Sequence, residues 1–130
     1  MRIVYCIPAT SNSGGMERVL TRKVNYLVEQ GHELIIVTTD QKGAKPFFPL
    51  EGSVKQYDLG INYDENNGQG ILAKLTAYPK KKRLHRQRLR ELLEQLRANI
   101  VISMFGDDAT LLPQMKDGSR KVLEYHFSKL

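Results

Sequence analysis

The sequence predicts an α/β fold in which helices cover a mostly parallel sheet. Short apolar runs at residues 2–7, 34–39 and 100–105 are rich in β-branched residues and alternate little, which is typical of strands buried on both faces. Segments with helical periodicity lie between these runs. This alternation of strand and helix predicts parallel strands joined by right-handed crossovers.

The first strand leads through a polar loop, residues 8–15, into a helix predicted at residues 16–30. Apolar residues recur in this helix at the i, i+3, i+4 spacing that places them on one face. They are Met16, Val19, Leu20, Val24, Leu27 and Val28. Gly31 stands where a helix commonly ends, and the second strand, residues 34–39, closes on Asp40.

The middle of the chain carries weaker signals. Residues 41–53 hold two glycines and two prolines and predict an irregular connection, followed by a short third strand at 54–59. After a polar stretch at 60–70, we expect one or two turns of helix at 71–78. Pro79 is expected to stop that helix, because proline lacks a backbone donor.

A longer helix is predicted at residues 84–98, with Asn99 at its C-terminal end. Its leucines share one face and its arginines occupy the others. These leucines are Leu84, Leu89, Leu92, Leu93 and Leu96.

The strand at residues 100–105 is followed by Gly106-Asp107-Asp108, a turn that can cap a helix. A short helix is predicted from there to about Met115. The last predicted strand covers residues 121–126.

The composition is that of a soluble globular domain. The chain has 130 residues, of which 41% are hydrophobic and 26% charged, and it contains no apolar run approaching about 18 residues. Met1–Val4 lack the features of a secretory leader. The single cysteine, Cys6, is expected to be a small buried hydrophobe, so we expect a reducing, cytoplasmic setting, with the inner face of the membrane as an alternative.

The positive charge is concentrated in one segment, residues 80–90. Seven of the chain's 20 basic residues lie there, with His85 among them and no acid. The rest of the chain holds 13 basic against 14 acidic residues. A solvated helix face, an anionic membrane surface and nucleic acid all remain open, nucleic acid being least favoured because no aromatic residues are interleaved. The candidate membrane patch is Lys80, Lys81, Lys82, Arg83 and Arg86.

The loop at residues 9–18 is the main candidate site. Strand, glycine turn and helix aim backbone N–H groups at an anion, and ligands of parallel sheets bind at such loops. The alternative is that Gly14-Gly15 merely makes a turn. The patterns G-x-G-x-x-G and Gly-Lys-Ser/Thr are both absent. Asp40 stands where a ribose-binding acid is expected, but it can equally be a cap or loop residue.

The chain resembles the N-terminal domain of GT-B glycosyltransferases of glycosyltransferase family 4. The resemblance extends over essentially the whole chain and is patchy between residues 41 and 98. The matching stretches are Gly14-Gly15-Met16-Glu17-Arg18-Val19, Gly31-His32-Glu33, Ile35-Ile36-Val37-Thr38, Ile100-Val101-Ile102-Ser103 and Glu124-Tyr125-His126-Phe127-Ser128.

The resemblance implies a Rossmann-like three-layer sandwich and a retaining transfer of a sugar from a nucleotide-sugar donor to an acceptor. Gly14 and Gly15 would face the donor diphosphate, and His126 would be the catalytic residue near the transferred sugar. Glu17 and Phe105 are weaker candidates for acceptor binding. No metal or other cofactor is implied, and the acceptor would be a glycan or a lipid-linked saccharide of polysaccharide biosynthesis.

The family also implies a second domain. We expect residues 1–130 to be a truncated N-terminal, acceptor-side domain, with the C-terminal donor-binding domain absent and the 130 residues alone inactive. Two rivals remain: a small nucleotide- or phosphate-binding module of Rossmann or flavodoxin kind, and a non-catalytic adaptor that docks on a membrane. A metal site is not favoured, because the histidines lie far apart in sequence and lack a cysteine partner. They are His32, His85 and His126.

Overall fold

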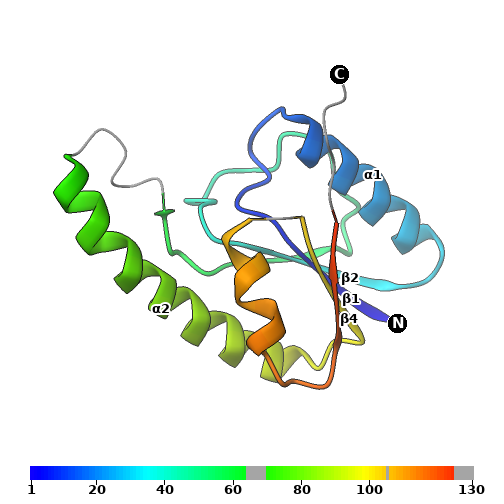
Figure 1. Cartoon of the computed structure of the whole chain (residues 1–130). Coiled ribbons are helices and arrows are strands. Elements are labelled where there is room, and N and C mark those ends of the chain that lie inside the picture. The colour runs from blue at the N-terminus through cyan, green and yellow to red at the C-terminus, as the bar shows by residue number, and fades with distance from the viewer. Residues whose placement is uncertain (64–69, 105, 125–130) are drawn as a thin grey trace.

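The structure, a computed structural model, describes residues 1–63, 70–104 and 106–124 (Figure 1). The strands are β1 (Arg2–Cys6), β2 (Glu33–Thr38), β3 (Lys55–Asp58), β4 (Ile100–Ser103) and β5 (Arg120–Leu123). The helices are α1 (Gly15–Glu29) and α2 (Ile71–Leu96), with short 3₁₀ helices η2 (Asp107–Thr110) and η3 (Leu112–Gln114).

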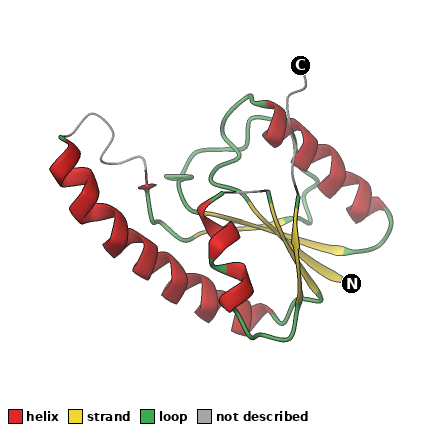
Figure 2. Ribbon diagram, viewed as in Figure 1, coloured by secondary structure: helices red, strands yellow, loops and turns green. Residues whose placement is uncertain are grey.

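The described strands form a five-stranded sheet in the order β3-β2-β1-β4-β5, and every neighbouring pair is parallel. Helix α1 covers one face and α2 the other (Figure 2). The residues of β1 alternate between the two cores: Val4 and Cys6 pack on the side of α2, Ile3 and Tyr5 on the side of α1. The predicted α/β, Rossmann-like three-layer sandwich with a parallel sheet is confirmed.

Helix α1 is built as its sequence predicts. It begins at Gly15, and Leu20 and Val24 are fully buried against the sheet. Gly31 follows the helix with φ +92°, a left-handed conformation that favours glycine, and turns the chain into β2.

The predicted stop of a helix at Pro79 is wrong. Helix α2 runs for 26 residues with Pro79 inside it. A proline removes one backbone donor, and here the helix continues on both sides of that missing bond. The C-cap is Arg97, in the left-handed region at φ 52°, and not Asn99. The Asn99 side chain instead accepts a hydrogen bond from the backbone N–H of Arg2 at 2.8 Å.

The short helix predicted after residue 108 is also different. It is broken into η2 and η3, and Pro113 lies in η3, where it cannot supply the backbone donor that a continuous helix needs. The third strand is confirmed at Lys55–Asp58, at the edge of the sheet. The last strand is confirmed at Arg120–Leu123, while residues 125 and 126 of its predicted range lie outside the described residues.

Candidate functional site

The carboxyl ends of the strands form the edge at which the candidate site lies. Strand β1 is central. The crossover through α1 leads from β1 to β2 on one side, and the crossover through α2 leads from β3 to β4 on the other side. This is the switch point at which parallel sheets bind ligands. The loops that follow β1 and β4 border it, one leading into α1 and the other into η2.

Gly14 and Gly15 form the exposed N-terminus of α1. Gly14 is the N-cap, with an extended backbone (φ −70°, ψ 170°), and its carbonyl accepts the N–H of Arg18 at 3.2 Å. Neither glycine has a positive φ, so the turn itself does not require glycine. A Cβ at Gly15 would meet no described atom within 4 Å, whereas one at Gly14 would come within 2.7 Å of the Glu17 carboxylate.

Glu17 lies in the first turn of α1, half-buried, with its Oε1 atom beside Gly14. It occupies the N3 position, from which a glutamate can reach back toward the helix start. Its negative charge lies where the helix dipole favours an anion. An anionic ligand at this N-terminus would therefore compete with Glu17 for the same positive end of the helix.

The first part of the glycine loop is held in place by the segment that follows β2. Thr10 donates both its N–H and its hydroxyl to Gln41 Oε1, at 2.8 and 3.2 Å. The Pro8 carbonyl accepts the N–H groups of Thr39 and Asp40 at 3.1 and 2.8 Å. Residues 12–15, by contrast, are exposed. The loop therefore has an anchored base and an accessible tip.

Asp58, at the end of β3, organises the neighbouring loop. Its Oδ1 accepts the Thr38 hydroxyl and the Gly60 N–H, each at 3.2 Å, and its Oδ2 faces the Lys42 N–H at 3.3 Å. Asp40, the ribose-binding candidate of the rival hypothesis, is half-buried at the end of β2. A ribose-binding role for Asp40 stays a prediction.

The loop after β4 packs tightly against the loop after β1. A Cβ at Gly106 would come within 3.2 Å of the Pro8 ring and 3.1 Å of Asp108 Oδ1. Asp108 is only 3% exposed, and among the described residues its Oδ2 has no hydrogen-bond partner. Burial raises the pKa of Asp108 to about 6, against the opposing effect of a hydrogen bond with Ser103. This carboxyl therefore titrates close to neutral pH.

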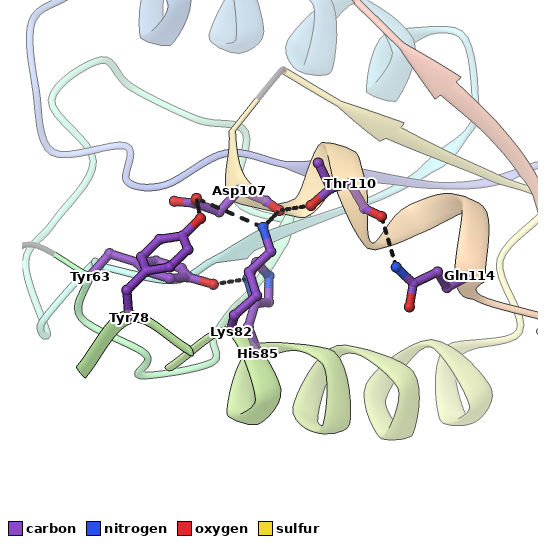
Figure 3. A network of polar contacts seen from close by, with 7 residues as sticks. All are labelled: Tyr63, Tyr78, Lys82, His85, Asp107, Thr110 and Gln114. Carbon is purple, nitrogen blue, oxygen red and sulfur yellow. Dashed lines mark hydrogen bonds and ion pairs between the residues drawn. The ribbon is translucent and has the colours of Figure 1, made fainter. Parts of the chain in front are cut away.

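A polar network joins α2 to the loop after β4 (Figure 3). Tyr78 donates its hydroxyl to Asp107 Oδ1 at 2.9 Å, and the Lys82 ammonium donates to the Asp107 carbonyl at 2.6 Å. Thr110 donates to the same carbonyl at 3.3 Å, which continues the network along η2. These contacts fix the position of Asp107, and with it the start of η2, relative to α2.

His85 lies at the inner end of this network and is 1% exposed. Its Nδ1 is 2.7 Å from the hydroxyl of Tyr63. Burial, and after it the charge of Lys82, lowers the pKa of His85 to about 4, so the ring is neutral at pH 7. In the sequence His85 lies within the basic segment. Its spacing from Leu89 and Leu93, i+4 and i+8, was the signal that it belongs to the buried stripe.

The candidate membrane patch divides into two sets of side chains. Lys82 is partly buried against Asp107, and Lys81 donates to the Asn62 carbonyl. Lys80, Arg83 and Arg86 are exposed. Two of the five predicted patch residues thus contact the protein itself.

Cys6 is buried, as expected, and burial raises the pKa of its thiol. Phe105 and His126 lie outside the described residues. Within the part of the chain that the structure describes, no three His, Cys, Asp or Glu side chains converge on a metal-binding geometry. No helix of that part combines the length and the apolar character needed to cross a bilayer.

Comparison with protein-family models finds no match, and no curated protein matches either. Among solved structures, the chain is similar to a crystal structure of UDP-galactose 4-epimerase. The identity is 19%, the TM-score is 0.40, and the match covers 87% of this chain and 42% of the other. The chain thus spans less than half of that protein's length.

Proposed function

We propose that this chain is the acceptor-side N-terminal domain of a retaining GT-B glycosyltransferase similar to glycosyltransferase family 4. The reaction would move a sugar from a nucleotide-sugar donor to a glycan or a lipid-linked saccharide. The donor nucleotide would be held by a second domain facing the carboxyl edge of the sheet.

The observation that supports this proposal most strongly is the open, glycine-only start of α1 at the switch point. Gly15 is exposed, has no described atom near its missing Cβ, and does not need glycine for its own backbone conformation. A glycine that neither conformation nor packing requires fits a place where a ligand approaches the backbone. The first N–H groups of a helix suit a diphosphate there, because they lack intrahelical partners.

In the proposed mechanism the backbone N–H groups at Gly14 and Gly15 stabilise the charge that develops on the leaving phosphate. Glu17, beside Gly14, would be displaced toward the acceptor or would bind it. His126 is proposed, on the resemblance alone, to lie next to the transferred sugar. The proposal includes no metal ion.

The other motif of the resemblance has a structural role. Gly31-His32-Glu33 lies at the amino edge of the sheet, opposite the candidate site. His32 Nδ1 is 3.1 Å from the N-terminal amine, and the Glu33 carboxylate is 3.1 Å from the Arg2 side chain. These residues stabilise the turn into β2, so this stretch carries no chemistry in the proposal.

The test is Gly15→Val in the full natural gene product, assayed for sugar transfer from nucleotide-sugars. In the free protein a Cβ at Gly15 would meet no described atom within 4 Å, whereas the valine side chain would occupy the place proposed for the diphosphate. We expect kcat to fall by about 100-fold, the size of effect seen when an oxyanion-stabilising donor is lost. Gly52→Val is the matched control, because Gly52 is likewise exposed, lacks a positive φ and has no described atom near its missing Cβ.

Equal turnover of the Gly15→Val and Gly52→Val variants would overturn the proposed role of the loop. Sugar transfer by residues 1–130 alone would contradict the need for a second domain.

A small nucleotide-binding module is the second candidate, favoured by one observation. The glycine loop lies at the switch point of the strand order β3-β2-β1-β4-β5, where dinucleotides bind in related sheets. Calorimetric titration of residues 1–130 with a nucleoside diphosphate separates the two. The nucleotide-binding module would be favoured by two results together. Residues 1–130 would bind the nucleoside diphosphate and lose that binding in Gly15→Val, and the full gene product would show no transferase activity.

A further inference from the structure

Helix α2 is much longer than the sheet that it covers. Its 26 residues span about 39 Å at about 1.5 Å per residue. The strands have four to six residues and span about 13–20 Å. Because β4 starts soon after α2 ends, the excess length lies at the N-terminal end of α2, beyond the carboxyl ends of the strands (Figure 1).

The apolar stripe of α2 continues into this overhanging part. Ile71, Leu75 and Tyr78 are spaced i, i+4 and i+7, in phase with the buried residues further along the helix. Leu89 and Leu93 in that buried part are both 0% exposed. Ile71, Leu75 and Tyr78 are 76%, 63% and 48% exposed, and the adjacent Leu72 is 80% exposed. Tyr78 contacts Tyr63 and Asp107, whereas no described segment covers Ile71, Leu72 and Leu75.

Cationic side chains flank the uncovered stripe. Lys80, Arg83 and Arg86 are exposed, and residues 71–90 contain no acidic residue. A shallow hollow beside Tyr78 is lined by Pro79, Lys82, Arg83 and Arg86. Apolar side chains that can enter a bilayer thus lie next to cations that can bind anionic headgroups, as in helices that lie in the membrane interface.

We propose that the overhanging half of α2, residues 71–86, is a docking surface for an anionic lipid bilayer. The charge decides between the possible occupants. A second copy of this chain would bring like charges together across the stripe, whereas anionic headgroups attract all three exposed cations. Docking would hold the carboxyl edge of the sheet close to the bilayer, because the overhang extends beyond that edge. The proposal does not depend on the transferase proposal.

The experiment is sedimentation of the full chain with phosphatidylglycerol vesicles and with phosphatidylcholine vesicles. We expect binding to the anionic vesicles, with affinity falling steeply as salt is added. Replacing Lys80, Arg83 and Arg86 together by Gln should weaken binding by about 100-fold, because each cation near the surface contributes about fivefold. Replacing Ile71, Leu72 and Leu75 by Ser should weaken it by at least about tenfold.

Two control variants remove three cations and two exposed apolar side chains elsewhere on the chain. Lys45, Lys116 and Arg120, which are exposed elsewhere, are replaced by Gln, and the exposed Tyr26 and Phe47 by Ser. Both controls should bind as the unaltered chain does. Equal binding to the two vesicle types, binding to neither, or equal losses in the control and α2 variants would overturn the proposal. If the chain bound no vesicles and formed a dimer, and if Ile71→Ser dissociated that dimer, a second copy of the chain would be the occupant.

Discussion

The two halves of α2 have the same kind of apolar stripe and opposite surroundings. In the C-terminal half, Leu89 and Leu93 are fully buried among the residues of β1, β2 and β4. In the N-terminal half, Ile71, Leu72 and Leu75 are at least 63% exposed. The comparison teaches that an amphipathic pattern predicts a helix and the direction of its apolar face, but not whether anything packs against that face.

The largest expected effect of a single substitution comes from the buried half. Leu93→Ala should lower the free energy of unfolding by about 3 kcal/mol, because it removes buried methyl groups and leaves a cavity. Urea denaturation followed by circular dichroism measures this loss. Leu75→Ala, the matched change in the exposed half, should lie within about 0.5 kcal/mol of the unaltered chain. Similar losses for the two variants would show that the N-terminal half is packed as well.

The next effect is the pH dependence of stability that arises from His85, which lies where the two halves of α2 meet. The pKa of His85 is lowered to about 4 in the fold, so the unfolded chain binds the proton first. As pH falls from about 6.5 toward 4, His85 should therefore destabilise the fold by about 3 kcal/mol.

Asp108, in the neighbouring loop, changes the free energy of unfolding with pH in the opposite direction. Its pKa is raised to about 6, so the folded chain binds the proton first. Its contribution of about 3 kcal/mol is present below pH 4 and is lost as pH rises through 6. The two effects offset each other between pH 4 and 6, and the stability of the unaltered chain should change little there.

Single variants separate the two groups. Between pH 4 and 6 the stability of His85→Gln should fall as pH rises, because Asp108 alone remains, and that of Asp108→Asn should rise. Urea denaturation at several pH values gives these slopes. If stability changed with pH in the same way in the two variants and in the unaltered chain, the pKa shifts given to His85 and Asp108 would both be wrong.

The smallest expected effect comes from Pro79→Ala. Alanine restores the backbone donor that proline lacks, so amides of residues 71–83 should exchange more slowly with solvent. The global free energy of unfolding should change by less than about 1 kcal/mol, because the overhanging half contributes little buried surface. Hydrogen exchange of individual amides measures the local effect. Unchanged exchange together with a large global stabilisation would show that this half belongs to the cooperative core.

Much of the fold could be predicted from local patterns. The β-branched run around Val4 predicted a strand buried on both faces, and the spacing of Leu20 and Val24 predicted the buried face of α1. Gly31 marked the end of that helix correctly. The candidate site was placed at Gly14 and Gly15, and the structure locates them at the exposed start of α1, at the carboxyl edge of the sheet.

The contacts around Asp107 and Asp108 could not be predicted in this way. They join α2 to the loop after β4, segments that are more than 20 residues apart in the cases of Tyr78 and Lys82. The residues that make these contacts come together only because the chain crosses from β3 through α2 to β4. The charge run at residues 80–86 likewise predicted cations but not which of them face the protein, since Lys82 contacts Asp107 while Arg83 and Arg86 are exposed.

The sequence by itself determined the α/β class, the strand that precedes the glycine loop and the helical phase of each apolar stripe, because these depend on periodicity and on backbone preferences of single residues. Only the tertiary structure decided that α2 continues through Pro79 and that its apolar stripe is uncovered on the N-terminal side of His85. The physical reason is length. A helix stripe is buried only as far as a sheet lies beneath it, and the relative lengths of α2 and the strands appear only when the chain is folded.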